Sequence, residues 1–195
     1  PGVYRYEVDA PRVAEKTQPG QFVILRTHEE GERIPLTVAD FDRKKGVLTL
    51  IFQVVGASTE LLAQMKEGDA ILDLVGPLGQ KSHIASGLGT VVCIGGGIGV
   101  APVYPITRGM KEAGNRVISI IGAKSRDILI MEKEMRAASD ETLVTTDDGS
   151  YGIKGFVTTA LKELLARGER IELVYAIGPV VMMKSVADVT RPLGI

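Results

Sequence analysis

The chain has 195 residues, a formal net charge of -1 and a sequence pI near 6.2. That length suffices for one or two domains with cores of their own. The balanced charge, without a Lys/Arg cluster, argues against a nucleic-acid partner, and no apolar run approaches the length of a membrane span. We therefore expect a globular protein with neither nucleic-acid nor membrane partners.

The single cysteine indicates the redox compartment of the protein, and the two chain ends indicate how far the natural polypeptide extends. Cys93 lies in an apolar run, where core packing is its expected role, and one thiol cannot form an internal disulfide. This usage fits a reducing cytoplasm. The sequence opens on Pro1 with neither a Met nor a signal-like segment, and it stops at Ile195 just after a helical stretch. We expect the natural polypeptide to extend past both ends.

The first part of the chain, up to about residue 87, predicts an antiparallel β-barrel. Short alternating or β-branched runs are separated by turn residues such as those of RKKG and KEGD. One helix interrupts them over residues 58–69, with Ser58 or Thr59 as the N-cap and Gly68 as the stop. The expected strands are residues 3–8, 21–27, 34–40, 47–55 and 70–75.

The second part, residues 88–195, changes to an alternation of strands and helices. Such alternation predicts βαβ units, and hence an α/β domain with a parallel sheet covered on both faces. We therefore expect two domains, 1–87 and 88–195. The expected strands are 90–95, 116–123, 142–147 and 172–178, and the expected helices are 101–114, 128–139, 157–168 and 179–190.

The segment VVCIGGGIGVAP, residues 91–102, predicts a buried strand, a tight turn and a helix N-terminus. Such a junction binds phosphate groups well, because free N–H groups and the positive end of the helix dipole point outward. The spacing does not follow G-x-G-x-x-G, so the glycines could instead serve only close packing. However, each of the four strands ends in a small or polar cluster, and all four would lie at the carboxyl edge of the sheet. A dinucleotide is therefore expected near Gly96 to Gly99.

The motifs GERIPLTVAD, FQVVGASTELL, GPLG, GGGIGVAP, TTDDGSYGIKG and AIGPVVMMK together resemble the ferredoxin-NADP reductase superfamily. Within it they are most similar to the small subunits of NADH-dependent ferredoxin:NADP oxidoreductase (sulfide dehydrogenase) and to the electron-transfer subunits of dihydroorotate dehydrogenase. The resemblance implies that the barrel binds FAD and the second domain binds NAD(P)H. It also implies hydride transfer from nicotinamide to flavin, which needs no general acid or base.

The resemblance assigns two groups of residues to FAD. The family's R-x-Y-S or R-P-x-S motif falls on RIPLT, one place out of register, because an Arg aligned with Thr37 as the family's Ser would stand at Ile34. The strand end and turn that follow would form a second anion site, although an ordinary N-cap explains Ser58 and Thr59 equally well. The assigned residues are Arg33, Pro35, Leu36, Thr37, Gln53, Val54, Val55, Gly56, Ser58 and Thr59.

Two clusters favour different nicotinamide nucleotides. Lys124, Ser125 and Arg126 could hold a 2'-phosphate, although they also suit a solvated helix entry. Asp147 and Asp148 could accept hydrogen bonds from a free ribose 2'-hydroxyl, although Asp-Gly is also a common turn. We favour NADH because an acidic residue in the loop after the third strand resembles the NADH users of the superfamily. The remaining residues assigned to the nucleotide are Gly95, Gly96, Gly97, Ile98, Gly99, Gly178 and Pro179.

The chain as a whole predicts an FAD-containing electron-transfer subunit. The resembling subunits carry a [2Fe-2S] cluster on four cysteines, which one Cys cannot supply, so a cluster is expected only in a longer natural chain. The expected partner is a larger flavoprotein subunit, with ferredoxin as a further candidate. The alternatives are a dihydroorotate dehydrogenase subunit and a regulatory or scaffolding subunit without flavin. His28 and His83 are expected in exposed loops, and we predict no metal site.

Overall fold

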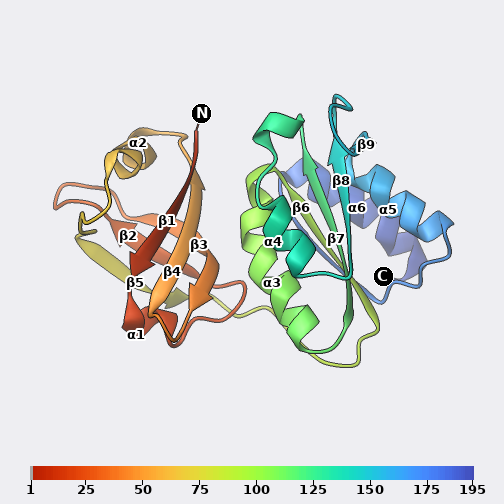
Figure 1. The fold of residues 1–195 in the computed structure, drawn as a ribbon, viewed down its shortest axis with the longest axis horizontal. Helices are drawn as coiled ribbons and strands as arrows, with labels where there is room; N and C mark the ends of the chain where they lie inside the picture. The colour runs from red at the N-terminus through yellow and green to blue at the C-terminus, as the bar shows by residue number, and fades with distance from the viewer. Residues whose placement is uncertain (1) are drawn as a thin grey trace. The chain divides into compact units, whose positions relative to one another are not determined.

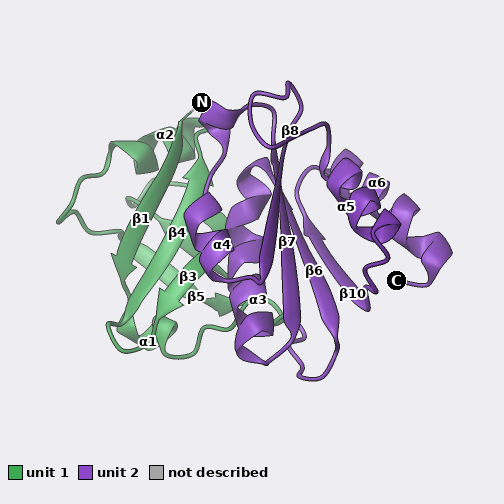
Figure 2. Cartoon of the chain, turned by 45° about the vertical axis from the view of Figure 1, so that its right-hand side comes forward, with its two compact units in different colours: residues 1–82 green, residues 83–195 purple. Residues whose placement is uncertain are grey.

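The computed structural model describes residues 2–195, and the chain divides into two units. The first unit ends at Ser82 and the second is His83–Ile195, in green and purple in Figure 2. This division lies five residues before the boundary expected at residue 87.

The first unit is a five-stranded antiparallel sheet with the strand order β1-β4-β3-β2-β5 (Figure 1). The register of β1 with β4 runs from Val3 opposite Gln53 to Asp9 opposite Val47. All five expected strands are present, with shifted ends. They are β1 (Val3–Asp9), β2 (Phe22–Arg26), β3 (Ile34–Asp42), β4 (Val47–Gln53) and β5 (Asp73–Leu78).

This sheet curls around one apolar core. Leu48 and Leu50 of β4 pack in that core with Val8 of β1 and Leu74 of β5, so both outer strands contribute to it. Irregular register within β2 and β3 provides bends of the kind that β-bulges produce. Within residues 2–195 the outer strands β1 and β5 are not hydrogen-bonded to each other. The predicted barrel is therefore an antiparallel sheet that is wrapped around its core without closing.

Two helices accompany this sheet. The first, α1 (Pro11–Ala14), was not predicted and is only one turn long. The second, α2 (Ala57–Gln64), begins after Gly56, so the expectation of Ser58 or Thr59 as its N-cap was wrong. It ends at Gln64 rather than near Gly68, because Met65 already has an extended ψ of 145°.

The second unit is a five-stranded sheet with the order β10-β6-β7-β8-β9, and every pair in it is parallel. The parallel sheet predicted from the alternation of strands and helices is thus confirmed. Its strands are β6 (Thr90–Gly96), β7 (Arg116–Ala123), β8 (Glu141–Thr146), β9 (Ile153–Lys154) and β10 (Leu173–Ile177). Only β9, with two residues, was not predicted.

Helices cover both faces of this sheet (Figures 1 and 2). Residues of α3 (Val100–Glu112) and α4 (Glu132–Ala137) share one core with Val91 and Cys93 of β6. Residues of α5 (Val157–Ala166) and α6 (Val180–Thr190) share the other core with the alternate residues Val92 and Ile94. This period of two explains why β6 reads as an uninterrupted apolar run, since both of its faces are buried.

Cys93 is fully buried, and burial raises the pKa of its thiol to about 12. The predicted core role of this residue therefore fits its surroundings. The helix expected over 128–139 is shorter, because Met131 precedes α4 with a left-handed φ of 55°. No helix among residues 2–195 is long and apolar enough to cross a membrane.

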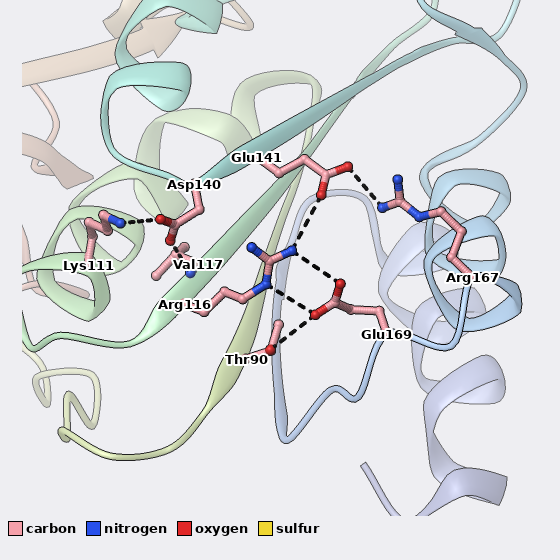
Figure 3. A network of polar contacts seen from close by, with 8 residues as sticks. All are labelled: Thr90, Lys111, Arg116, Val117, Asp140, Glu141, Arg167 and Glu169. Atoms are coloured by element: carbon pink, nitrogen blue, oxygen red, sulfur yellow. Dashed lines mark hydrogen bonds and ion pairs between the residues drawn. The ribbon is translucent and has the colours of Figure 1, made fainter.

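Charged side chains are paired at the amino edge of the parallel sheet, where β6, β7 and β8 begin (Figure 3). Arg116 lies 3.2 Å from Glu169 and 3.7 Å from Glu141, and Arg167 lies 2.9 Å from the other oxygen of Glu141. The hydroxyl of Thr90 also donates to Glu169 at 3.2 Å. These contacts tie the starts of three neighbouring strands to the end of α5 and the loop that follows it.

Candidate functional site

The glycine-rich loop after β6 is shaped largely by packing within the second unit. A Cβ at Gly95 would lie 2.7 Å from the Cα of Val100. At Gly99 it would overlap the carbonyl oxygen of Ile177 and lie 2.8 Å from the Cα of Gly178. Because the atoms that each added Cβ would meet belong to the backbone, a side chain at Gly95 or Gly99 would require the strands and the helix to move. The packing explanation of the glycines thus holds for Gly95 and Gly99.

Gly97 differs from these two glycines. It has a left-handed φ of 55°, and an added Cβ would meet nothing within 4 Å. Gly97 and Ile98 are exposed, and they lie in a 3-10 turn, Gly97–Gly99, that leads into α3. The first N–H groups of such a turn have no carbonyl partner one turn earlier, and they lie at the positive end of the helix dipole. This exposed backbone leaves room for an anionic group.

The turn after β10 lies beside that loop. A Cβ at Gly178 would lie 3.2 Å from the carbonyl oxygen of Gly96, and Met182 of α6 packs against both glycines. Pro179 follows as the N-cap of α6. The chain passes from β6 to β7 on one side, while β10 returns to the other side of β6. The predicted residues at the ends of β6 and β10 therefore meet at the reversal of strand order, where open α/β sheets bind ligands.

The basic and acidic clusters after β7 and β8 are brought together by hydrogen bonds. The backbone N–H of Arg126 donates to the hydroxyl of Ser150 at 2.9 Å, and that of Asp148 donates to the carbonyl of Lys124 at 3.2 Å. The Arg126 guanidinium lies 5.0 Å from the centre of the Tyr151 ring. Tyr151, which the sequence did not single out, thus provides an aromatic face beside a cation.

The two acidic residues have different surroundings. The N–H and hydroxyl of Ser150 donate to Asp148 at 2.9 and 2.6 Å, and these hydrogen bonds, the hydroxyl's first, lower the pKa of that carboxyl. Asp148 therefore stabilises the Asp-Gly turn. Asp147 and Lys124 are exposed, and neither side chain forms an ion pair within the described part of the chain. Ser125 donates to Asp127 at 2.5 Å, so its hydroxyl is engaged locally.

In the first unit, the residues predicted to contact FAD lie on two neighbouring strands and the helix that follows them. Pro35, Leu36 and Thr37 of β3 lie opposite Ile24, Val23 and Phe22 of β2. The side chain of Arg33 is 63% exposed and lies 3.8 Å from Asp73. The same carboxylate binds Arg26 at 2.5 Å. Arg33 is thus the more weakly held of two cations beside one acid.

The second predicted flavin segment is an open turn between β4 and α2. Gln53 ends β4, and the N–H of Val54 donates to the carbonyl of Gly2 at 3.1 Å. Val55 is 79% exposed, and nothing lies within 4 Å of a Cβ built on Gly56. The Thr59 hydroxyl accepts from the N–H groups of Val55 and Gly56 at 2.9 and 3.1 Å. Thr59 therefore shapes the turn, which remains accessible to a large group.

Ser58 points to a residue that sequence reasoning missed. Its hydroxyl donates to the carboxylate of Glu32 at 2.5 Å. The two residues line a cavity of about 210 Å³ between the β2–β3 loop and α2. Glu32 had no signal of its own in the sequence, because it stands in an acidic run, HEEGER, that suits an exposed loop.

The two histidines lie in exposed loops. His28 contacts the Thr27 hydroxyl at 2.9 Å, and the backbone carbonyl of His83 accepts from the Tyr175 hydroxyl at 2.7 Å. Among residues 2–195, no three His, Cys, Asp or Glu side chains are grouped so as to hold a metal ion.

A wrapped antiparallel sheet followed by a parallel sheet with a glycine loop at its switch point is the architecture of ferredoxin reductase-like oxidoreductases. Comparisons with known proteins agree. The oxidoreductase NAD-binding domain family matches residues 93–188. A ferredoxin NADP+ reductase from Neisseria gonorrhoeae superposes on 98% of the chain, and on 85% of its own length, with a TM-score of 0.78 at 19% identity.

More similar relatives define the family. The dihydroorotate dehydrogenase B (NAD+) electron transfer subunit homolog of Thermotoga maritima is 46% identical over 99% of this chain and 67% of its own length. The corresponding subunit of Fusobacterium nucleatum is 35% identical over 95% of this chain and 73% of its own. A solved structure of NADH-dependent reduced ferredoxin-NADP oxidoreductase matches with 46% identity and a TM-score of 0.90, over 97% of this chain and 67% of that one.

The chain belongs to the family of these electron-transfer subunits, within the ferredoxin-NADP reductase superfamily. It is thus an oxidoreductase of the electron-transfer type, as the sequence motifs predicted, and it spans about two thirds of the length of the relatives from Thermotoga and Fusobacterium.

Proposed function

We propose that the chain binds FAD on its antiparallel unit and NADH at the carboxyl edge of its parallel sheet. When both are bound, the nicotinamide supplies a hydride that the flavin accepts. The residues of this chain would bind and orient the two groups, and neither His28 nor His83 is needed as an acid or base. The observation that carries the proposal is the open backbone at Gly97, beside the turn at Gly178, within a family of electron-transfer subunits.

The residues of the second unit fit a nicotinamide dinucleotide. The exposed backbone from Gly97 to Ile98 suits a pyrophosphate, because N–H groups and the helix dipole favour negative charge there. Arg126 and Tyr151 offer a cation and an aromatic face to the adenosine end. Asp147, which lacks an ion-pair partner among the described residues, would accept from a ribose 2'-hydroxyl and repel a 2'-phosphate. Of these features, Asp147 is the one that favours NADH over NADPH.

The residues of the first unit fit a flavin dinucleotide. The turn from Val55 to Gly56 is open, and exposed apolar surface at Val55 would be covered by a bound group. Arg33 is the more weakly held cation beside Asp73, at 3.8 Å against 2.5 Å for Arg26, and its side chain is 63% exposed. We assign Arg33 to a flavin phosphate, and we assign Pro35 to Thr37 on β3 to the ring system.

Electrons would leave the flavin for a larger flavoprotein subunit. The relatives from Thermotoga and Fusobacterium are named as electron transfer subunits, so a hetero-oligomeric assembly is the expected setting. Cys93 is the only cysteine of these 195 residues, so they do not supply the four thiolates of a [2Fe-2S] cluster, and we propose such a cluster only for a longer natural chain. Ferredoxin is a further candidate partner.

A second candidate concerns the destination of the electrons. The relatives from Thermotoga and Fusobacterium are named for dihydroorotate dehydrogenase B, which favours a dihydroorotate-oxidising partner. Purification of the natural complex distinguishes the two. A second pyridine-nucleotide flavoprotein supports the ferredoxin:NADP assembly, and a pyrimidine-forming enzyme supports the other.

An anaerobic absorbance titration tests the proposed cofactors. The purified protein is reconstituted with FAD and titrated with NADH and, separately, with NADPH. We expect flavin bands that bleach at far lower concentrations of NADH than of NADPH. If no flavin is retained after addition of FAD, the proposal fails and a scaffolding role without flavin replaces it.

A further inference from the structure

Tyr151 is held both by the loop that carries it and by a helix from an earlier part of the chain. Its N–H donates to the hydroxyl of Thr146 at 3.1 Å, and that hydroxyl donates to the carbonyl of Tyr151 at 2.7 Å. The phenol hydroxyl of Tyr151 donates to the carboxylate of Glu132 at 2.9 Å. Glu132 is the first residue of α4, 19 residues earlier in the sequence. Tyr151 is therefore fixed at its backbone and at the far end of its ring.

The Glu132 carboxylate is in turn held by Arg136, one turn further along α4. The oxygen that accepts from Tyr151, Oε1, also accepts from Nε of Arg136 at 2.8 Å and lies 2.7 Å from Nη2 of the same guanidinium. The Glu132 side chain is 27% exposed. Glu132 thus joins the ring of Tyr151 to the helix, with donors from both.

The chain enters α4 through a strained residue. Met131 has a φ of 55° and a ψ of 26°, and it is the one non-glycine residue with a positive φ among residues 2–195. Such a conformation persists only where the surrounding contacts determine it, and it is found most often beside functional sites. The side chain of Met131 packs against an apolar core, while the next residue, Glu132, reaches Tyr151. The strained turn therefore places the carboxylate beside the loop after β8.

The charge of Glu132 is unfavourable for the ligand proposed above. Arg126, whose guanidinium lies 5.0 Å from the centre of the Tyr151 ring, is assigned to a dinucleotide with an anionic pyrophosphate. A carboxylate bonded to the same tyrosine repels that anion. If charge were its only effect, removal of Glu132 would tighten nucleotide binding. If Glu132 only stabilised α4 through the helix dipole and Arg136, its removal would leave binding unchanged.

We infer that Glu132 is a positioning residue of the nucleotide site, which holds the ring of Tyr151 beside the Arg126 guanidinium before a nucleotide binds. The inference rests on the proposed function, because Arg126 and Tyr151 are assigned there to the adenosine end. A side chain that is ordered in advance loses less conformational entropy on binding, so the affinity is higher. Glu132 acts through Tyr151 and does not itself touch the ligand.

Calorimetric titration of the FAD-reconstituted protein with ADP-ribose tests this role, since ADP-ribose has the adenosine end of NADH but no nicotinamide to reduce a flavin. Glu132→Ala and Tyr151→Phe should each weaken binding by about fivefold, the cost of ordering one side chain on binding. The double variant should bind no more weakly than either single variant, because both changes remove the same link. Glu132→Gln keeps an oxygen that accepts from the Tyr151 hydroxyl, so its affinity should stay within about twofold of the wild type.

Lys133→Ala is the matched control, because it truncates an exposed side chain in the same turn of α4, and it should leave the affinity unchanged. If Glu132→Ala does not fold, Tyr151→Phe carries the same test, since it removes only the hydroxyl that reaches Glu132.

Three results would overturn the inference while leaving the proposed function intact. They are unchanged or tighter binding of ADP-ribose by Glu132→Ala and Tyr151→Phe, additive losses in the double variant, and a loss in Glu132→Gln as large as that in Glu132→Ala. Absence of ADP-ribose binding by the wild type would instead refute the proposed nucleotide site, and this inference with it.

Discussion

The two edges of the parallel sheet use charge in opposite ways. At the amino edge, Arg116, Glu141, Arg167 and Glu169 are joined to one another (Figure 3). At the carboxyl edge, Lys124 and Asp147 stand in exposed loops without an ion-pair partner among residues 2–195. β7 and β8 thus begin beside charged side chains that are paired with each other, and they end beside charged side chains that could bind a ligand.

This difference assigns the amino edge of the sheet to stability and the loops of the carboxyl edge to ligand binding. Paired and partly buried charges hold strand ends together, whereas unpaired charges in loops can meet a ligand. Mutations at the amino edge should therefore change the free energy of unfolding without changing nucleotide affinity. Mutations of the unpaired charged side chains at the carboxyl edge should instead change nucleotide affinity without changing the free energy of unfolding.

Gly99→Ala should have the largest effect on stability, because Gly99 packs directly against the backbone of Ile177 and Gly178. The added Cβ would overlap the carbonyl oxygen of Ile177, so the backbone must move. We expect a loss of about 3 kcal/mol in the free energy of unfolding, measured by urea denaturation. Gly97→Ala is the matched control, with a cost of about 1 kcal/mol from its left-handed φ alone. Equal losses in the two variants would contradict this account.

Glu169→Ala should have the next largest effect. It removes the acceptor of Thr90 and the bidentate partner of Arg116. Since the Glu169 side chain is 21% exposed, we expect a loss of about 1 kcal/mol, between the values for surface and buried pairs. The dissociation constant for NADH should not change. Glu163→Ala, at an exposed position of α5, is the control and should have little effect on stability. A weaker affinity for NADH in Glu169→Ala would contradict the division of roles between the two edges of the sheet.

Acid should weaken the amino edge through Asp140. Its hydrogen bond with Lys111, and then that from the N–H of Val117, hold the pKa of this carboxyl below its ordinary value of 3.8. A lowered folded-state pKa adds stability above the unfolded pKa, and that stability is lost as the pH falls below about 4.

Asp140→Asn tests this dependence. The variant should be less stable than the wild type by under about 1 kcal/mol at pH 6, and the difference should shrink towards pH 3. Urea midpoints at several pH values measure it. An unchanged difference across that range would show that Asp140 acts through packing rather than through its charge.

The sequence predicted the second unit better than the first, for a physical reason. A parallel sheet with both faces buried gives long apolar strands, so β7 was predicted with its observed ends, residues 116–123. In the first unit, closure of a barrel depends on hydrogen bonding between β1 and β5, which are far apart in sequence. The local sequence pattern of either strand cannot predict whether they pair. The short α1 and β9 also escaped prediction, because four and two residues carry no periodicity.

The candidate sites were predictable as segments but not as individual roles. The loop from Gly95 to Gly99 was found from its glycines, yet only the structure separates Gly97, which faces open space, from Gly99, which faces backbone. Glu32 was missed because its partner Ser58 lies 26 residues further along the chain. Contacts of this kind follow from tertiary packing and leave no trace in local spacing.

The smallest predicted effect concerns Asp147, where the carboxyl edge is most open. Asp147→Asn should raise the affinity for NADPH relative to NADH by about threefold, since one exposed charge no longer repels a 2'-phosphate. Asp148→Asn is the informative comparison, because Ser150 already occupies that carboxylate and its loss should disturb the turn instead. Separate titrations with the two nucleotides measure both ratios. The opposite result, a shifted ratio in Asp148→Asn and an unchanged ratio in Asp147→Asn, would contradict this assignment. Asp148 would then both stabilise the turn and discriminate between the two nucleotides.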